Sequence, residues 1–356
     1  NLSLDALDFW ITTPAKTKGL EVCSGPAGCD SVGGLALRNF PVSHSVMGAT
    51  AFAVETSAGW VGYTGDLRCC GVDAPSTERF VQQMAALHLR VLICEGTRAS
   101  LDSEASDGHA PVPEEAVYDR ALAAVRAGPG LVIADFGPRN VERLITFQRI
   151  AEETSRALVV LARDAYLLEA MGLASANVPR LAEMPNVLIY ADLKSRVPSW
   201  EAKLREKYGS RLVAAPQVRA RPGDYILCFG FWDMGDVIDI RPQGGTYIYS
   251  SREAYSEEQQ LDMRRLLHWI EHFGMTAVGL PREGLDWKVP PSERGLHASG
   301  HASGPELLDM VRRIAPRTLV PVHTECPQYF VSSLEGSGIE VSVPQPGASM
   351  SFSDRR

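Results

Sequence analysis

Four side chains suited to metal binding or proton transfer each follow a segment that reads as a short β-strand. They are Asp66 after residues 60–64, Glu95 after residues 91–94, His323 after residues 319–322 and His44 after residues 40–42. In open α/β sheets ligands gather at the carboxyl ends of strands, so we expect these four side chains to converge. Histidine and carboxylate in one cluster are typical of a zinc site or of acid–base chemistry. Any one of them alone would be a polar residue that ends a turn.

The segment LHASGHASG, residues 296–304, offers a second set of chemical groups. On a helix, His297 and His301 would share a face and resemble a zinc-binding pair. Gly300 between them favours a loop instead, and a loop at a helix N-terminus can hold a phosphate with its N–H groups and Ser299. A tight glycine turn with surface histidines is the alternative.

Other catalytic patterns are absent from the sequence. There is no Walker A loop, GxGxxG, GxSxG or HExxH motif. His268 and His272 are four positions apart on a predicted helix, where we interpret them as packing or surface residues.

The elements that must position these groups alternate between strands and helices. The predicted strands cover residues 50–55, 59–63, 90–94, 130–134, 157–162, 187–190, 225–228, 246–249, 318–322 and 339–343. A helical pattern over residues 141–151 lies between two continuous apolar runs, which predicts a β-α-β unit in a parallel sheet. Ser303 and Glu306 form a capping-box pattern at the start of another helix, and Pro316 ends it.

Composition sets the broad class. The chain has 356 residues, 45% hydrophobic and 22% charged, which is typical of a globular protein with roughly two domains. The net charge of −8 excludes a protein that coats nucleic acid through bulk positive charge but leaves room for a local basic groove. Seven scattered cysteines do not form a disulfide framework and favour the cytoplasm. No apolar run approaches the ~18 residues of a membrane span, and no signal peptide is visible.

Several segments together resemble a known family. FPVSHSVMGATAFAVET and GWVGYTGDLR resemble the third and fourth motifs of the metallo-β-lactamase superfamily. LICEGTR resembles motif A of the β-CASP nucleases, and LHASGHASGPELLDMVRRIAPRTLVPVHTE resembles motifs B and C of ribonuclease J-like enzymes. GLVIADFGPRNVERLITFQRIAEETSRALVVLARD and TYIYSSREAY are similar to parts of the β-CASP domain. The motifs occur in the family's order.

The resemblance implies an α/β fold with two domains. One is a metallo-β-lactamase αββα sandwich, incomplete at its N-terminus and formed by residues 1–97 and 271–356. The other is an inserted β-CASP α/β domain formed by residues 98–270. The active site is then expected in the cleft between the two domains.

The resemblance also implies roles for individual residues. His44 would bind the first zinc ion, Asp66 would bridge both ions, and His323 would bind the second. With Asp66, the catalytic residues would be Glu95, which orients its neighbours, and His301, which acts near the scissile phosphate. The residues that would hold RNA phosphates are His297, Ser299, Ser250 and Ser251.

The sequence departs from the family pattern in three places. The HxHxDH motif is absent, so each zinc ion keeps only two ligands, His44 and Asp66 or Asp66 and His323. Because the chain opens on Asn1, we expect the motif to lie in an N-terminal portion upstream, and a natural metal-poor paralogue is the alternative. PVHTE replaces PVHGE at Thr324, and we expect no counterpart of the family's C-terminal dimerisation domain after the last predicted strand.

These observations predict a zinc-dependent hydrolase with two zinc ions per complete site, which cleaves RNA phosphodiester bonds by metal-activated water. A hydrolase of a small ester or phosphodiester on the same scaffold is one alternative, and an inactive, metal-poor RNA-binding paralogue is another. RNA is the expected partner, and no membrane association is expected. Homo-oligomerisation, exo- or endonuclease action, end polarity and the choice of RNA or DNA stay open.

Overall fold

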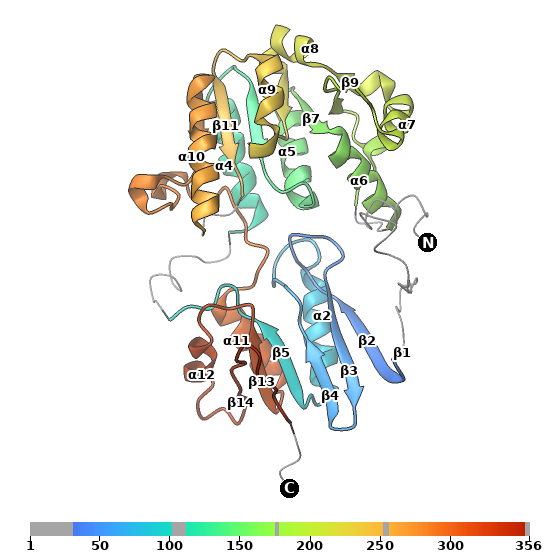
Figure 1. Ribbon diagram of the computed structural model, residues 1–356, viewed down its shortest axis with the longest axis vertical. Coiled ribbons are helices and arrows are strands. Elements are labelled where there is room, and N and C mark those ends of the chain that lie inside the picture. Colours follow the sequence, from blue (N-terminus) through green and yellow to red (C-terminus); the bar gives the residue numbers. More distant parts are fainter. Residues whose placement is uncertain (1–30, 102–111, 175–177, 252–255, 353–356) are drawn as a thin grey trace. The chain divides into compact units, whose positions relative to one another are not determined.

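The computed structural model describes residues 31–101, 112–174, 178–251 and 256–352, so Asn1 and its neighbours lie outside the described residues. The chain divides into two compact units, which are shown in Figure 1. One unit contains Glu114–Ala298. The other combines the described residues up to Pro113 with those from Ser299 onward.

The unit that contains Ser299 is built on a seven-stranded sheet of order β1-β2-β3-β4-β5-β13-β14. The strands are β1 (Ser31–Val32), β2 (Leu35–Pro41), β3 (Thr50–Thr56), β4 (Gly59–Tyr63), β5 (Val91–Glu95), β13 (Thr318–Val322) and β14 (Glu340–Val341). The first four strands are antiparallel, and the predicted hairpin of β3 and β4 is confirmed. From β4 to β14 the neighbouring strands are parallel.

Helices cover one face of this sheet. They are α2 (Ala74–Ala85), α11 (Gly304–Ile314) and α12 (Gln328–Ser333). Ala51, Ala53 and Leu92 are fully buried on the covered face, in one core with side chains of all three helices. On the opposite face Phe52 and Tyr63 pair across β3 and β4 and remain 38% and 44% exposed. The described part of this unit therefore holds one helix-covered sheet of the predicted sandwich.

The Glu114–Ala298 unit contains an all-parallel sheet of order β12-β11-β6-β10-β7-β8-β9. Its strands are β6 (Val132–Asp135), β7 (Ala157–Leu161), β8 (Val187–Tyr190), β9 (Leu212–Val213), β10 (Tyr225–Leu227), β11 (Gly245–Tyr249) and β12 (Met275–Val278). Its helices are α4 (Glu114–Arg126), α5 (Val141–Glu153), α6 (Ala162–Ala174), α7 (Ser199–Lys207), α8 (Ala215–Ala220), α9 (Met234–Ile240) and α10 (Glu257–His272).

This sheet explains the continuous apolar runs in the sequence, because strands with helices on both faces are buried on both sides. The predicted β-α-β unit is present as β6, α5 and β7. These two strands are not neighbours, because β10 lies between them and pairs in parallel with both. Among the helices of the described residues, none has the length and apolar character that a membrane crossing requires.

The second boundary between the two units lies after Ala298, later in the chain than the sequence predicts. The predicted boundary at residue 270/271 assigns β12 to the metallo-β-lactamase domain. The structure instead pairs β12 with β11 through four residue pairs, from Gly245–Met275 to Ile248–Val278. The unit that contains β11 therefore continues to Ala298.

Candidate metal centre

The order of the strands brings the candidate residues to one edge of the Ser299-containing sheet. Strands β4, β5 and β13 are adjacent and parallel, so the residues that follow them share an edge. Strand β2 runs in the same direction, because β2 and β4 are each antiparallel to β3. His44 follows β2, Asp66 follows β4, Glu95 ends β5 and His323 follows β13.

Ligand atoms of five residues form two overlapping groups at this edge. His44, Asp66 and His301 make one group, and Asp66, Glu95 and His323 make the other. Within each group the ligand atoms lie within 4.8 Å of one another. Asp66 belongs to both groups, and its Oδ1 lies 3.1 Å from Nδ1 of His323.

Glu95 is the buried anchor of the cluster, with its side chain 1% exposed. Its Oε1 accepts a hydrogen bond from the backbone N–H of Leu67 at 2.6 Å. Its Oε2 accepts one from the Thr97 hydroxyl at 2.8 Å and lies 2.8 Å from Nδ1 of His301. Because both oxygens are already engaged, Glu95 is better placed to fix its neighbours than to hold an ion.

Thr97 is a residue of this cluster that the sequence interpretation does not single out. Its hydroxyl donates to Glu95 and lies 3.3 Å from Nδ1 of His323, so it contacts members of the site from two strands. Its place two residues after Glu95 in LICEGTR was the available indication.

His44 is oriented by its backbone partner. Its Nδ1 lies 2.5 Å from the carbonyl oxygen of Gly300. A carbonyl only accepts, so Nδ1 carries the proton and Nε2 keeps the lone pair that a metal ion can take. Burial lowers the pKa of His44, which favours the neutral, ligating form of the ring. The ring centroid of His301 lies 5.0 Å from that of His44.

Two backbone features shape the site. A Cβ on Gly300 would lie 2.5 Å from Oγ of Ser45 and 2.8 Å from Cε1 of His44, so only glycine lets the loop approach the His44 ring. His323 has a φ of +50°, a left-handed conformation that non-glycine residues rarely adopt. Thr324, at the departure from PVHGE, accepts a hydrogen bond from the Cys326 N–H at 3.1 Å and has no such positive φ.

The donor set fits zinc. Imidazole nitrogen and carboxylate oxygen are ligands that Zn²⁺ takes, and three of them within 4.8 Å of one another can reach a common ion. The hydrogen bonds that His44 donates to the Gly300 carbonyl and His301 donates to the Glu95 carboxylate are of the kind that orients histidines at metal sites.

Comparisons with known proteins agree with this chemistry. Residues 293–344, which include His301 and His323, match a family model described as the Zn-dependent metallo-hydrolase RNA specificity domain. The chain is also 21% identical over 296 residues to ribonuclease J of Mycoplasma pneumoniae, with 80% of this chain and 45% of that protein covered. Both matches support a relationship to the ribonuclease J-like proteins of the β-CASP and metallo-β-lactamase group.

A solved structure shares the fold of this chain. It is a protein of unknown function from Enterococcus faecalis V583, with a TM-score of 0.64 and 23% sequence identity. The match covers 93% of this chain and 66% of the solved one. The chain thus spans about half the length of the curated relative and about two thirds of the solved structure.

Of the residues predicted to hold RNA phosphates, only Ser299 lies in the unit with the metal centre. Its hydroxyl oxygen accepts a hydrogen bond from the His301 N–H at 3.1 Å. The next helix, α11, begins at Gly304, and the Glu306 carboxylate in its first turn accepts a hydrogen bond from the Ser303 N–H at 2.8 Å. The Ser303 N–H is therefore engaged, whereas the Ser299 hydroxyl, which accepts from His301, keeps its own proton to donate.

The remaining three residues belong to the Glu114–Ala298 unit. Ser250 is 2% exposed, and its hydroxyl donates to the Leu296 carbonyl and accepts from the fully buried Arg143. The predicted contact of Ser250 with RNA is therefore corrected, because its hydroxyl is closed off inside the unit. His297 is half-buried, and Ser251 lines a cavity.

Proposed function

We propose that this protein is a zinc-dependent hydrolase of the β-CASP type that cleaves phosphodiester bonds in RNA. The observation that carries the proposal is the membership of Asp66 in both ligand groups. A carboxylate shared by two neighbouring sets of ligands is the natural bridge between two divalent ions, and paired ions are typical of enzymes that cleave phosphodiesters.

His44, Asp66 and His323 are the residues that would hold zinc. Two ions bound there would supply Lewis-acid activation of a water nucleophile and of the phosphoryl oxygens. The position of His323 next to Asp66, at 3.1 Å, and the free Nε2 of His44 support these roles. The geometry also leaves His301 within reach of an ion held by His44 and Asp66.

His301 would act on the bound substrate, and Glu95 would hold the His301 ring in place. Because Nδ1 of His301 faces Glu95, Nε2 is the ring nitrogen of His301 that would act on the substrate. A proton held there would stabilise charge on a phosphoryl oxygen or pass to the leaving-group oxygen. Glu95 would fix the ring in that orientation through its contacts with Leu67 and Thr97.

The choice of RNA as substrate rests on the RNA-specificity match of residues 293–344, which contain both His301 and His323. Ser299 lies two residues before His301 and would contribute a hydroxyl to a phosphate of the bound strand. The net charge of −8 makes a local contact of this kind more plausible than a broad basic surface.

The experiment compares cleavage of end-labelled single-stranded RNA by the wild type and by the Asp66→Asn and His323→Ala variants, each supplied with zinc. We expect both variants to lose cleavage by about 100-fold or more, because groups that stabilise transition-state charge contribute that much. Asp309→Asn is the matched control, since Asp309 is 69% exposed on α11 and lies outside the site.

Unchanged rates in both variants would contradict the proposal. Cleavage of a small phosphodiester but not of RNA would favour the alternative hydrolase. Salt-sensitive RNA binding without zinc or cleavage would favour an inactive binding protein.

A further inference from the structure

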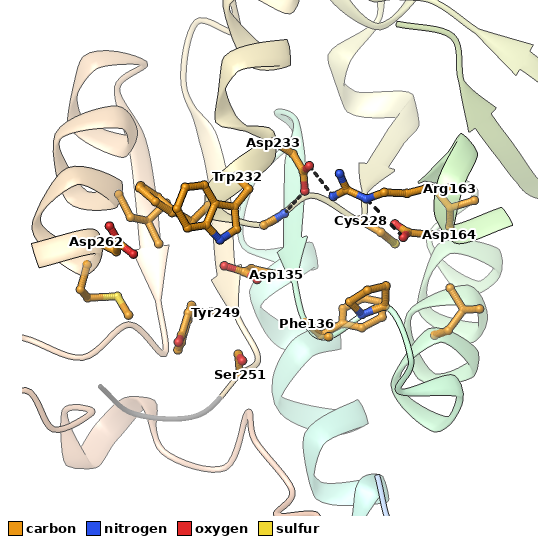
Figure 2. A pocket seen from close by; sticks show the side chains of 18 of the residues that line it. Asp135, Phe136, Arg163, Asp164, Cys228, Trp232, Asp233, Tyr249, Ser251 and Asp262 are labelled. Atoms are coloured by element: carbon orange, nitrogen blue, oxygen red, sulfur yellow. Dashed lines mark hydrogen bonds and ion pairs between the residues drawn. The ribbon is translucent and has the colours of Figure 1, made fainter. Parts of the chain in front are cut away.

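The Glu114–Ala298 unit contains a cavity that the proposed hydrolase does not use. The cavity has a volume of about 320 Å³ and opens at the carboxyl ends of β6, β7, β10 and β11, where parallel sheets gather ligands. Figure 2 shows Asp135 near its middle, with Asp262 of α10 on one side and Asp164 of α6 on the other. The volume falls within the range of small-molecule sites.

The charged groups that line the cavity are mainly acidic. Of the lining residues that the structure describes, four are aspartates, and Arg163 is the single Lys or Arg. Arg163 pairs with Asp233, with Nη2 2.6 Å from Oδ1, and its Nε lies 3.7 Å from Asp164. Asp262 pairs with Arg265, which is not among the lining residues, at 3.3 Å. These two arginines are fewer than the four aspartates, so the remaining acidic groups favour a cation over phosphate and other anions.

Asp135 lies near the middle of the cavity, between Asp262 and Asp164. Its Oδ2 accepts a hydrogen bond from the Tyr247 hydroxyl at 2.6 Å, and Oδ1 is the remaining oxygen. Burial raises the pKa of Asp135 and of Asp164 to about 7. Keeping these carboxylates ionised in the cavity is unfavourable in the empty protein, and a cationic ligand would relieve that cost.

The rest of the lining is aromatic and aliphatic. Phe136 stacks on Phe147, with ring centroids 5.3 Å apart, and Trp232 packs edge-on against Phe231 while 80% exposed. An exposed indole beside carboxylates is unusual on a monomer surface but is typical of sites that bind organic cations, because its face attracts positive charge. Methylene groups of a ligand would cover the aromatic faces.

The cavity does not suit a compact metal ion. The groups of three ligand atoms within 4.8 Å of one another that the described residues offer lie at the metal centre, and none includes an aspartate of the cavity. Figure 2 shows Asp135, Asp164 and Asp262 apart from one another along the cavity, which favours a ligand whose positive charges are separated.

We propose that this cavity binds a linear aliphatic polyamine. One ammonium group would contact Asp135, others would reach Asp164 on α6 and Asp262 on α10, and the methylene chain would lie along Phe136 and Trp232. A guanine base, the next best candidate, would pair with one carboxylate and leave the others without a counter-charge. The proposal does not depend on the metal centre or on RNA cleavage.

The test is calorimetric titration of the protein with spermidine in the absence of zinc and RNA. We expect Asp135→Asn to weaken spermidine binding by about 10-fold or more, because it removes a charge-assisted hydrogen bond. Tyr247 can still donate to the amide oxygen of asparagine, so this variant should fold. Trp232→Ala should weaken binding as well, without touching a charge.

Asp309→Asn is the control for non-specific attraction, because it changes the net charge equally on an exposed surface. Titrations with guanosine and with magnesium chloride complete the experiment. Equal spermidine affinity in the wild type and Asp135→Asn would overturn the proposal. So would an absence of spermidine binding, or binding of guanosine in preference to spermidine.

Discussion

Oδ1 of Asp66 lies 3.1 Å from Nδ1 of His323, although 257 positions separate the two residues in the chain. The contact exists because β5 pairs in parallel with both β4 and β13, which places the ends of all three strands at one edge. Asp66 also belongs to the group with His44 and His301. A single carboxylate thus joins the two halves of the candidate metal centre.

The first prediction concerns metal content. Asp66→Asn should remove zinc from both ligand groups, whereas His323→Ala should affect mainly the group that contains His323. Elemental analysis of purified protein beside its intact mass measures this directly. We expect zinc per chain to fall further in Asp66→Asn than in His323→Ala, with Asp309→Asn unchanged. Equal zinc in all four proteins would remove the basis for a shared site.

The second prediction concerns Thr97 as a positioning residue. Thr97→Val removes the hydroxyl that donates to Glu95 but keeps the shape of the side chain. We expect the rate of RNA cleavage to fall by about 10- to 100-fold while bound zinc is retained, because such orienting contacts typically contribute that much. Thr97→Ser should restore most of the activity. A valine variant as active as the wild type would show that the hydroxyl is dispensable.

The third prediction concerns the close approach of Gly300 to His44. A methyl group in Gly300→Ala would lie 2.8 Å from the His44 ring and would displace it or the loop. We expect weaker zinc binding in a competition titration with a chelator. Gly235→Ala on α9 is the matched control, because a Cβ there meets nothing within 4 Å. Identical zinc affinities in Gly300→Ala and Gly235→Ala would mean that the loop shifts to accommodate the methyl group without weakening zinc binding.

The fourth prediction separates two adjacent serines. Ser250→Ala removes a buried hydroxyl that bonds to Arg143 and to the Leu296 carbonyl, so we expect the free energy of unfolding to fall by about 1–3 kcal/mol. Ser251→Ala should leave it nearly unchanged, since Ser251 is only half-buried at the cavity. Urea denaturation measures both. RNA affinity that drops in Ser250→Ala at unchanged stability would restore its predicted contact with substrate.

The fifth prediction is a pH dependence of stability in the Glu114–Ala298 unit. The pKa of Asp135 and of Asp164 is about 7 in the folded protein, above the value near 4 expected when the chain is unfolded. Between these values the unfolded chain releases protons that the folded protein keeps, so stability should fall as the pH rises from about 4 to 7.

Asp135→Asn should reduce this slope and should be more stable than the wild type above pH 7, by up to about 4 kcal/mol. Thermal denaturation at a series of pH values checks the sign. A wild type that gains stability relative to Asp135→Asn on going from pH 5 to pH 8 would contradict the assignment.

Much of the fold could be predicted from the sequence. The apolar runs at residues 157–162 and 318–322 became β7 and β13, because a strand covered by helices on both faces, or by one helix layer, must be apolar where it is buried. The position of chemical groups at strand ends predicted that Asp66, Glu95 and His323 share an edge. The start of α11 at Gly304 followed from the capping residues before it.

Other features depended on contacts between distant segments. The place of β12 beside β11, the insertion of β10 between β6 and β7, and the closure of Ser250 by Arg143 leave no local pattern in the chain. The cavity around Asp135 also arises only when four strand ends meet. By itself the sequence determined which residues form strands, which of them carry chemical groups and which family pattern they follow. Only the tertiary structure decided how these groups are arranged within the site and which of them are buried, because sheet order and burial depend on packing between segments far apart in the chain.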